Sequence, residues 1–355
     1  MLENWLKAGK IGENLQSWQL GQNIQSFTSD FPDLKNSKVA LIGTGKDVDK
    51  IRKHLYDLAY AFPKMAIADI GNLRKATDAF LLPVIRELLE NNIIPIIISH
   101  KALQFSAQFK AYQNIRKKVN VAVIDERTPL HTADVHYLST IRKSKVPKLD
   151  NLGLVGYQSH LCPPSTINFY QRKNYELTRL GVAKKQMENV EPTLRAADSI
   201  YFNLAALKYT EAPGLWQNSP SGFSSEEACQ LCHYAGMSDK LTSIGFYGYQ
   251  AKKDKDGQTA LLIAHLIWYL LEGIYNRKRD FPASTDSMIE YIVSFKDYDH
   301  NATFWKSTKS GRWWIQMDSD TKGKHELIPC TYEDYQMACK DELTARILNV
   351  FERYT

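Results

Sequence analysis

The sequence predicts a three-layer α/β/α fold, with a doubly wound parallel sheet and a C-terminal appendage. Between residues 38 and 282, short apolar runs alternate with amphipathic segments of helical period, which is typical of a parallel sheet covered by helices on both faces. Successive apolar runs are far enough apart for the crossovers that parallel strands require. After Pro282 the segments become shorter and more aromatic. We therefore expect a lead-in over residues 1–37, the α/β domain over 38–282 and an appendage over 283–355.

Each expected element of the α/β domain follows from an apolar run or from an amphipathic segment. The strands are predicted at residues 39–43, 65–70, 93–99, 119–125, 152–156, 199–204 and 243–249. The helices are predicted at residues 47–61, 77–91, 103–118, 181–188, 224–235 and 259–276. The lead-in has no clear period, so we expect it to be helical or irregular.

The appendage is predicted to contain a β-hairpin and a closing helix. Residues 288–295 have the pattern of a strand, and residues 303–317 that of a hairpin with Lys309-Ser-Gly311 at its turn. The closing helix is expected over residues 331–353. The many aromatic residues exclude a disordered tail.

Three tryptophans of the appendage are candidates for binding a partner: Trp305, Trp313 and Trp314. Adjacent residues of a strand point to opposite faces, so one ring of the Trp313–Trp314 pair can enter the core. The other ring must be covered by the closing helix, by a partner or by water. The simpler interpretation is that these aromatics dock the appendage on the domain; a protein-binding surface is the alternative.

Bulk properties describe an ordinary globular protein. The 355 residues are 44% hydrophobic and carry a net charge of +6, with basic residues spread along the chain. Dispersed charge of this kind is typical of solvated helix ends, and we expect no nucleic-acid partner. There is no signal-peptide pattern and no apolar stretch that could span a membrane. Five cysteines, an odd number, favour reduced thiols and a cytoplasmic location.

Two short motifs have simpler explanations than the cofactor sites that they superficially match. Cys229-Gln-Leu-Cys232-His233 follows a helix-start pattern at Ser224, so both thiols are expected to pack a helix. Gly43-Thr-Gly45-Lys46 lacks the spacing of a phosphate-binding loop, and a tight turn between strand and helix explains its glycines.

Four strand ends carry the residues that bear on function. They lie in residues 95–103 (PIIISHKAL), 123–130 (VIDERTPL), 199–214 (SIYFNLAALKYTEAPG) and 245–250 (GFYGYQ). Together they resemble the arginase and formiminoglutamase (ureohydrolase) family. Its corresponding segments read Gly-Gly-Asp-His, Ile-Asp-Ala-His-x-Asp-Leu, Phe-Asp-x-Asp-x-x-Asp and Glu-Val-Asn-Pro. The resemblance covers about residues 38 to 276 and implies an arginase-like sheet, commonly in an oligomer.

The resemblance also implies that the metal site of that family has been lost. Family members bind paired manganese ions through six side chains, and the matching positions here are Ala102, Asp125, Arg127, Pro129, Asn203 and Ala205. A hard dication needs anionic oxygen or neutral imidazole ligands, and one carboxylate cannot hold two such ions. Lys208 stands at a further acidic position of the family, and Gly248 stands where a glutamate binds the substrate.

We therefore expect a catalytically inactive homologue without a catalytic residue or cofactor, which acts in protein interaction, as a scaffold or in ligand binding. The candidates for lining its cleft are His100, Lys101, Asp125, Arg127, Lys208 and Gly248. Asp125 is expected to pair with Arg127 or Lys208, and a surplus cation would favour a small anionic ligand. A collapsed cleft is the favoured form, because the substituted positions offer few polar groups.

Other functions stay open at this point. One is an active formiminoglutamase- or arginase-type hydrolase of linear amidines, with manganese in a rearranged site. A shifted zinc site could use Asp125 with His100, or with His131 and His136. Another is a regulator that binds an anionic metabolite in the vacated cleft. The expected macromolecular partner is another protein or a second copy of the chain.

Overall fold

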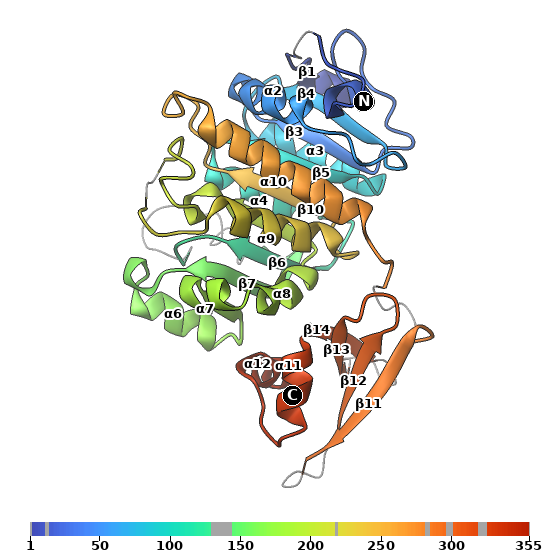
Figure 1. Cartoon of the computed structure of the whole chain (residues 1–355), viewed down its shortest axis with the longest axis vertical. Helices are drawn as coiled ribbons and strands as arrows, with labels where there is room; N and C mark the ends of the chain where they lie inside the picture. The colour runs from blue at the N-terminus through green and yellow to red at the C-terminus, as the bar shows by residue number, and fades with distance from the viewer. Residues whose placement is uncertain are drawn as a thin grey trace.

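The chain folds into two sheets of different kinds. The computed structural model describes residues 2–10, 14–128, 144–216, 219–280, 285–295, 301–318 and 325–354. Within these residues a ten-stranded, mostly parallel sheet forms the body, and a four-stranded antiparallel sheet forms the appendage (Figure 1). No helix in this part of the chain is long and apolar enough to cross a bilayer.

The body sheet contains all seven strands that the sequence predicts. They are β3 (Val39–Gly43), β4 (Ile67–Leu73), β5 (Ile94–Ser99), β6 (Lys118–Ile124), β7 (Lys148–Tyr157), β9 (Ser199–Asn203) and β10 (Ser243–Tyr247). They pair in parallel in the order β4-β3-β5-β10-β9-β6-β7. The α/β fold class is thereby confirmed.

Further short strands extend both edges of this sheet. The lead-in contributes β1 (Leu6–Lys7), antiparallel to β4, and β2 (Gln25–Ser26), parallel to β4. The short helix α1 (Leu20–Asn23) lies between them along the chain. At the opposite edge β8 (Glu176–Arg179) pairs with β7. Two-residue strands have no readable period, which is why the sequence did not reveal β1 and β2.

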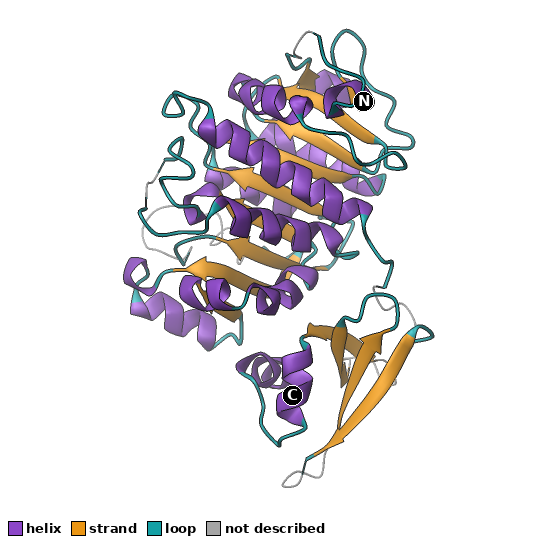
Figure 2. Cartoon of the chain, viewed as in Figure 1, coloured by secondary structure: helices purple, strands orange, loops and turns teal. Residues whose placement is uncertain are grey.

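Helices cover both faces of the body sheet and make three layers (Figure 2). One face packs α2 (Asp49–Asp57), α7 (Leu180–Lys185), α8 (Glu191–Arg195), α9 (Ser225–Met237) and α10 (Gln258–Tyr275). The other packs α3 (Asp78–Glu90), α4 (Phe105–Lys110) and α6 (Pro164–Gln171). Alternate residues of β3 divide between the two cores: Val39 and Leu41 face α2, and Ala40 and Ile42 face α3.

Helix α4 is shorter than the predicted helix over residues 103–118. It ends at Lys110, and the chain then turns through Asn114, whose φ of 70° is left-handed. Asparagine tolerates this conformation better than most residues, so the turn is encoded by one residue within an otherwise helical pattern.

A buried ionic network ties α2 to β4. The guanidinium of Arg52 donates to both carboxylate oxygens of Asp69 at 2.7 and 3.0 Å, and Tyr56 Oη donates to Asp69 Oδ2 at 2.8 Å. Arg52 Nη1 also donates to Asn72 Oδ1 at 2.7 Å. A Cβ at Gly43 would lie 2.0 Å from that same oxygen. Close packing against this network therefore explains Gly43 without a bound phosphate.

Helix α9 begins and packs as its sequence predicts. Ser224 and Glu227 form a capping box at its start. Cys229 and Cys232 are buried on its inner side. Burial, with a contribution from Glu226, raises the pKa of Cys229 to about 12. Burial also holds the pKa of Cys232 well above its ordinary value. Both groups are neutral packing thiols at physiological pH.

The appendage is larger than the predicted hairpin and helix. Its sheet has the order β11 (Met288–Ser294), β12 (Asn301–Ser307), β13 (Trp313–Asp318) and β14 (His325–Cys330). The expected hairpin is β12–β13, with Gly311 at a φ of 73° in its turn. Strand β14 was not expected, because its polar start and Pro329 conceal the pattern of a strand. The single closing helix is in fact two, α11 (Tyr332–Ala338) and α12 (Ala345–Tyr354).

Candidate functional site

The four strand ends singled out in the sequence meet at one edge of the body sheet. Tyr247 of β10 pairs with both Ser99 of β5 and Asn203 of β9, and Phe202 pairs with Ile124 of β6. Parallel pairing in this register brings the carboxyl ends of all four strands level. The side chains that follow these strands therefore share one strand-end site, at the edge where ligands bind in open α/β sheets.

The centre of the strand-end site is the Asp125 carboxylate, which is 3% exposed. Its Oδ2 accepts a hydrogen bond from Asn203 Nδ2 at 3.0 Å, and its Oδ1 accepts one from the Arg127 backbone N–H at 3.2 Å. The other atom of the Asn203 amide, Oδ1, accepts from the Ala205 N–H at 3.1 Å. Asn203 thus fixes the carboxylate on one side and caps the turn after β9 on the other.

This arrangement does not fit a pair of manganese ions. An amide nitrogen donor lies against Asp125 where the family carries an acid, and Ala102 and Ala205 have only methyl groups. Among the described residues no group of three His, Cys, Asp or Glu side chains is placed to hold a metal ion. Pro129, His131 and His136, which the sequence also singled out, lie outside the described residues. Fewer than three such donors come together among the described residues, which is too few for two hard cations.

The guanidinium of Arg127 pairs with the acid next to Asp125. We expected it to pair with Asp125, but its Nε lies 3.2 Å from Glu126 Oε1, and its side chain is about half exposed. Glu126 itself is 1% exposed. Its second oxygen, Oε2, is buried and has no hydrogen-bond partner among the described residues. The adjacent acid in the Asp125-Glu126 sequence was the only signal for it.

Of the two lysines expected in the cleft, Lys101 is directed elsewhere. Its ammonium donates to the carbonyl of Ala76 at 3.3 Å. Lys208 is half-buried, and its backbone N–H donates to the Phe223 carbonyl at 3.1 Å. The pKa of Glu226, in the first turn of α9, is lowered by its own backbone N–H, by Ser224 and by the charge of Lys208.

Gly248 lies beside Asn203, and His100 directly follows the end of β5. The carbonyl of His100 accepts from Gln250 Nε2 at 3.4 Å, and the ring is exposed. Partial burial and the nearby Lys101 lower the pKa of His100, and Asp47 opposes them. Gly248 has a φ of 102°, and a Cβ there would lie 3.3 Å from Asn203 Oδ1. A glutamate at this position would be strained.

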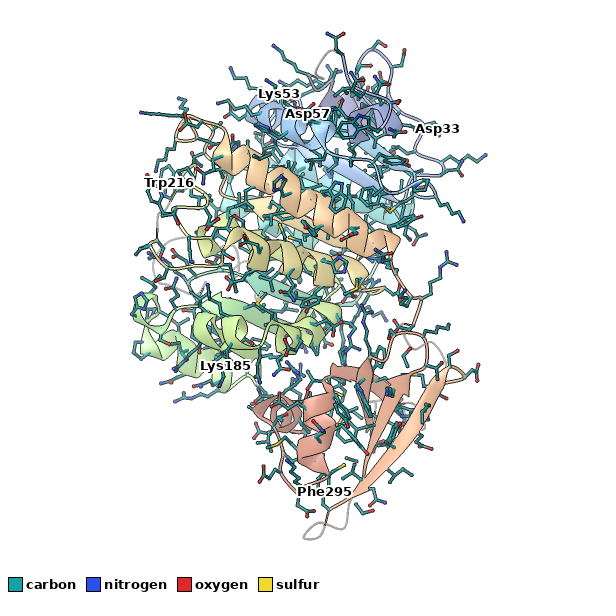
Figure 3. The ribbon with its side chains drawn as sticks, in the orientation of Figure 1. Asp33, Lys53, Asp57, Lys185, Trp216 and Phe295 are labelled. Carbon is teal, nitrogen blue, oxygen red and sulfur yellow. The ribbon has the colours of Figure 1, made fainter. Side chains whose placement is uncertain are left out.

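An exposed tryptophan stands at the rim of the strand-end site. Trp216 directly follows Leu215, which forms a bridge with Tyr249 just beyond β10. Its side chain is 72% exposed, and Figure 3 shows it projecting from the loops at this end of the sheet. Lys253 Nζ donates to the Trp216 carbonyl at 3.2 Å and lies 5.8 Å from the ring centroid. The sequence analysis did not single out Trp216, because exposure of a loop residue cannot be read from a sequence.

Two of the three tryptophans proposed for partner binding are buried within the chain itself. Trp313 is 5% exposed and stacks on Tyr335 of α11 at 4.7 Å. Trp314 is 1% exposed, and the guanidinium of Arg195 from the body lies 4.3 Å from its ring centroid. Neither is accessible to a partner. Trp305 is half-buried, and its Nε1 donates to Gln316 at 2.9 Å.

Buried arginines join the appendage to the body. Arg195 of α8 donates to the carbonyls of Trp313 and Cys330, both at 3.1 Å, and pairs with Glu191 at 2.9 Å. In the opposite direction, Arg346 of α12 pairs with Glu176 of β8 at 2.7 Å and donates to the carbonyl of Asn189.

A third arginine adds to this contact. Arg312, which precedes β13, pairs with Glu191 at 3.3 Å. Together the three guanidiniums bridge the two sheets with hydrogen bonds that have defined directions. The appendage is thereby held in one orientation on the body.

The α/β body has the fold of the arginase superfamily. A Trypanosoma cruzi formiminoglutamase determined with Mn²⁺ superposes with a TM-score of 0.62 and 15% identity, covering 70% of this chain and all of that one. A Bacillus subtilis formimidoylglutamase gives 0.61 and 14%, covering 76% and 96%. A Thermoplasma volcanium agmatine ureohydrolase gives 0.57 and 15%, covering 68% and 91%. No family model and no curated protein matches the sequence.

These likenesses confirm the arginase-like fold that the strand-end motifs predicted. At 14–15% identity they concern the fold alone. The full length of the T. cruzi enzyme is matched by 70% of this chain, so close to a third of this chain has no counterpart there.

Proposed function

We propose that this chain is a non-catalytic homologue of the ureohydrolases, which uses the arginase fold as a scaffold for binding another molecule. The observation that carries the proposal is the hydrogen bond from Asn203 Nδ2 to Asp125 Oδ2. Through this hydrogen bond a neutral amide contacts the carboxylate, at a position where the enzymes of the resembled family have a second acid.

The proposed loss of activity follows from the chemistry of water activation. In metal-dependent hydrolysis, bound cations lower the pKa of a water molecule so that hydroxide forms near neutral pH. Among the described residues of the strand-end site, the Asp125 carboxylate is bonded to Asn203 Nδ2 and to the Arg127 N–H, and the Glu126 carboxylate is paired with the Arg127 guanidinium. None of these three donors can coordinate a cation, because each presents hydrogen.

The binding role is supported by the outer rim of the strand-end site. Trp216 and the guanidinium of Arg127 are both exposed there. Exposed tryptophan and arginine are the residue types that most often anchor protein interfaces. The half-exposed guanidinium of Arg127 also leaves one cationic group for a small anionic ligand. A protein partner is favoured, because a tryptophan so exposed contributes little to a pocket for a small anion.

Calorimetry with Mn²⁺, combined with assays of urea and ammonia release, tests this function. The control is a rebuilt variant that carries Ala102→His, Arg127→His, Asn203→Asp and Ala205→Asp. We expect no stoichiometric Mn²⁺ binding and no turnover of arginine, agmatine or formiminoglutamate by the natural chain, and a gain of Mn²⁺ binding by the rebuilt variant. Tight binding by the natural chain, with turnover that a chelator abolishes, would establish the enzyme instead.

A further inference from the structure

Strand β11 is an unprotected edge of the appendage sheet. The sheet order places it outermost, with β12 as its neighbour, and Figure 1 shows it on the side of the appendage away from the body. Its seven residues pair with β12 in unbroken register. An edge strand presents a row of backbone donors and acceptors that can pair with another strand.

The register identifies which backbone groups face outward. Thr308 N–H donates to the Ser287 carbonyl at 3.0 Å, so this residue pair is hydrogen-bonded. Hydrogen-bonded and non-hydrogen-bonded pairs alternate along an antiparallel ladder. The backbone groups of Ile289, Tyr291 and Val293 therefore point toward β12, and those of the intervening residues point to the open edge.

Three amides of β11 are available on that open edge. Met288 N–H already donates to the Thr285 carbonyl at 3.0 Å. Glu290, Ile292 and Ser294 have no recorded backbone acceptor within the described residues. Each of these three also directs its carbonyl outward, so the edge can both donate and accept.

The side chains of β11 lack the features that protect natural edge strands. Ile292 is 61% exposed and Ile289 is 46% exposed. The strand contains no proline, no lysine and no bulge, and Glu290 is its one charged residue. Exposed apolar edges of this kind are found where another strand adds to the sheet.

We propose that β11 pairs antiparallel with β11 of a second copy of this chain, joining two four-stranded sheets across a two-fold axis at Tyr291. In this register Glu290 lies opposite Ile292 of the second copy, and Ile289 lies opposite Val293. All three available amides then find an outward carbonyl. A two-fold axis at Glu290 would instead set two glutamates opposite each other, which is unfavourable.

A second copy suits this edge better than an unrelated peptide, because the same strand supplies both halves of the register. A two-fold contact needs a self-complementary surface, which the arrangement about Tyr291 provides. Two short strands bury less area than a standard interface, so we expect a dissociation constant on the order of micromolar or weaker. The inference is independent of whether the strand-end site binds metal.

Sedimentation of the full chain, from about one to several hundred micromolar, tests the pairing. We expect a concentration-dependent dimer in the natural chain and a monomer in Ile292→Glu, which sets a second carboxylate opposite Glu290 of the other copy. The matched control is Leu348→Glu, on α12 of the same appendage and 45% exposed, which should dimerise like the natural chain. A natural chain that stays monomeric throughout, or an Ile292→Glu variant that dimerises equally well, would overturn the proposal.

Residue-resolved hydrogen exchange locates the contact independently. The amides of Glu290 and Ile292 should become protected as concentration rises, while those of Ile289 and Tyr291 should be protected at every concentration. A dimer whose Glu290 and Ile292 amides still exchange rapidly would use another surface, and that result also contradicts the proposal.

Discussion

The contact between the body and the appendage buries paired charges, whereas the strand-end site holds its buried acid with a neutral group. At the contact, Arg195 is 5% exposed and bound to two carbonyls and an acid. At the strand-end site, the buried carboxylate of Asp125 is held by the neutral amide of Asn203, while the side chain of Arg127 is about half exposed.

This difference shows where the chain depends on fixed charge. A buried guanidinium costs desolvation free energy, which is offset only where its hydrogen bonds are satisfied with good geometry. The contact meets that condition and uses it to orient the appendage. The described residues of the strand-end site contain no comparable buried ion pair. A further charge placed there would therefore find few groups to offset its desolvation free energy.

Replacing Arg195 should have the largest effect. Arg195→Ala leaves two buried carbonyls without their donor and Glu191 with Arg312 as its remaining partner, and we expect it to lower the free energy of unfolding by about 3–5 kcal/mol. Chemical denaturation followed through tryptophan fluorescence measures this loss. Arg195→Lys keeps the charge without the bidentate geometry of the guanidinium. It should therefore be more stable than Arg195→Ala but less stable than the natural chain. A loss below about 1 kcal/mol would show that the arginine does not hold the contact.

Introducing a second carboxylate at the strand-end site should have an intermediate effect. In Asn203→Asp the new acid lies against Asp125, and mutual repulsion raises the pKa of the pair above the ordinary value. The folded state then binds more protons than the unfolded state, so stability falls as pH rises. We expect a loss of about 1–3 kcal/mol at neutral pH that disappears on acidification.

Asn203→Ala is the matched control for that change. It removes the same hydrogen bonds without adding a charge, so its loss should vary less with pH than that of Asn203→Asp. If the free energy of unfolding depended on pH in the same way in both variants, residue 203 and Asp125 would not be in contact.

Acid should weaken the appendage through Asp334. Burial raises the pKa of this carboxyl, but the charge of Arg346 and hydrogen bonds from Thr344 and Thr331 outweigh it, so the net pKa is lowered. The stabilisation is therefore present above the unfolded-state pKa near 3.9 and is lost as pH falls through the lower folded-state value. Denaturation at successive pH values should reveal this step in the natural chain and not in Asp334→Asn.

Arg127→Ala should have the smallest effect. This side chain is about half exposed, but its partner Glu126 is buried. We expect a loss of about 1 kcal/mol, because the change leaves the buried carboxylate of Glu126 without this cation. A loss as large as that of Arg195→Ala would show that the strand-end site depends on charge after all.

The sequence predicted the body far better than its contacts. The parallel strands are buried on both faces, so they form continuous apolar runs that can be recognised in the sequence. The position of Asp125 and Asn203 at neighbouring strand ends also followed from their motifs. Their hydrogen bond did not, because it joins residues 78 apart and depends on side-chain rotamers.

The appendage was predicted less completely for similar physical reasons. Its strand β14 begins with exposed polar residues and contains Pro329, so no alternation marks it. The partners of Arg195 lie 118 and 135 residues away and are backbone carbonyls, which carry no sequence signal. Only the assembled fold shows that Trp314 is covered by this arginine rather than by a partner.

Anomalous diffraction at the manganese absorption edge, from crystals soaked in Mn²⁺, tests the central claim most directly. If a neutral amide has replaced the acid that would complete a metal centre, no anomalous peak will lie within coordinating distance of Asp125, and the Asn203 amide will remain in contact with its carboxylate. Two neighbouring peaks at the ends of β6 and β9, with Asn203 swung away, would contradict the account.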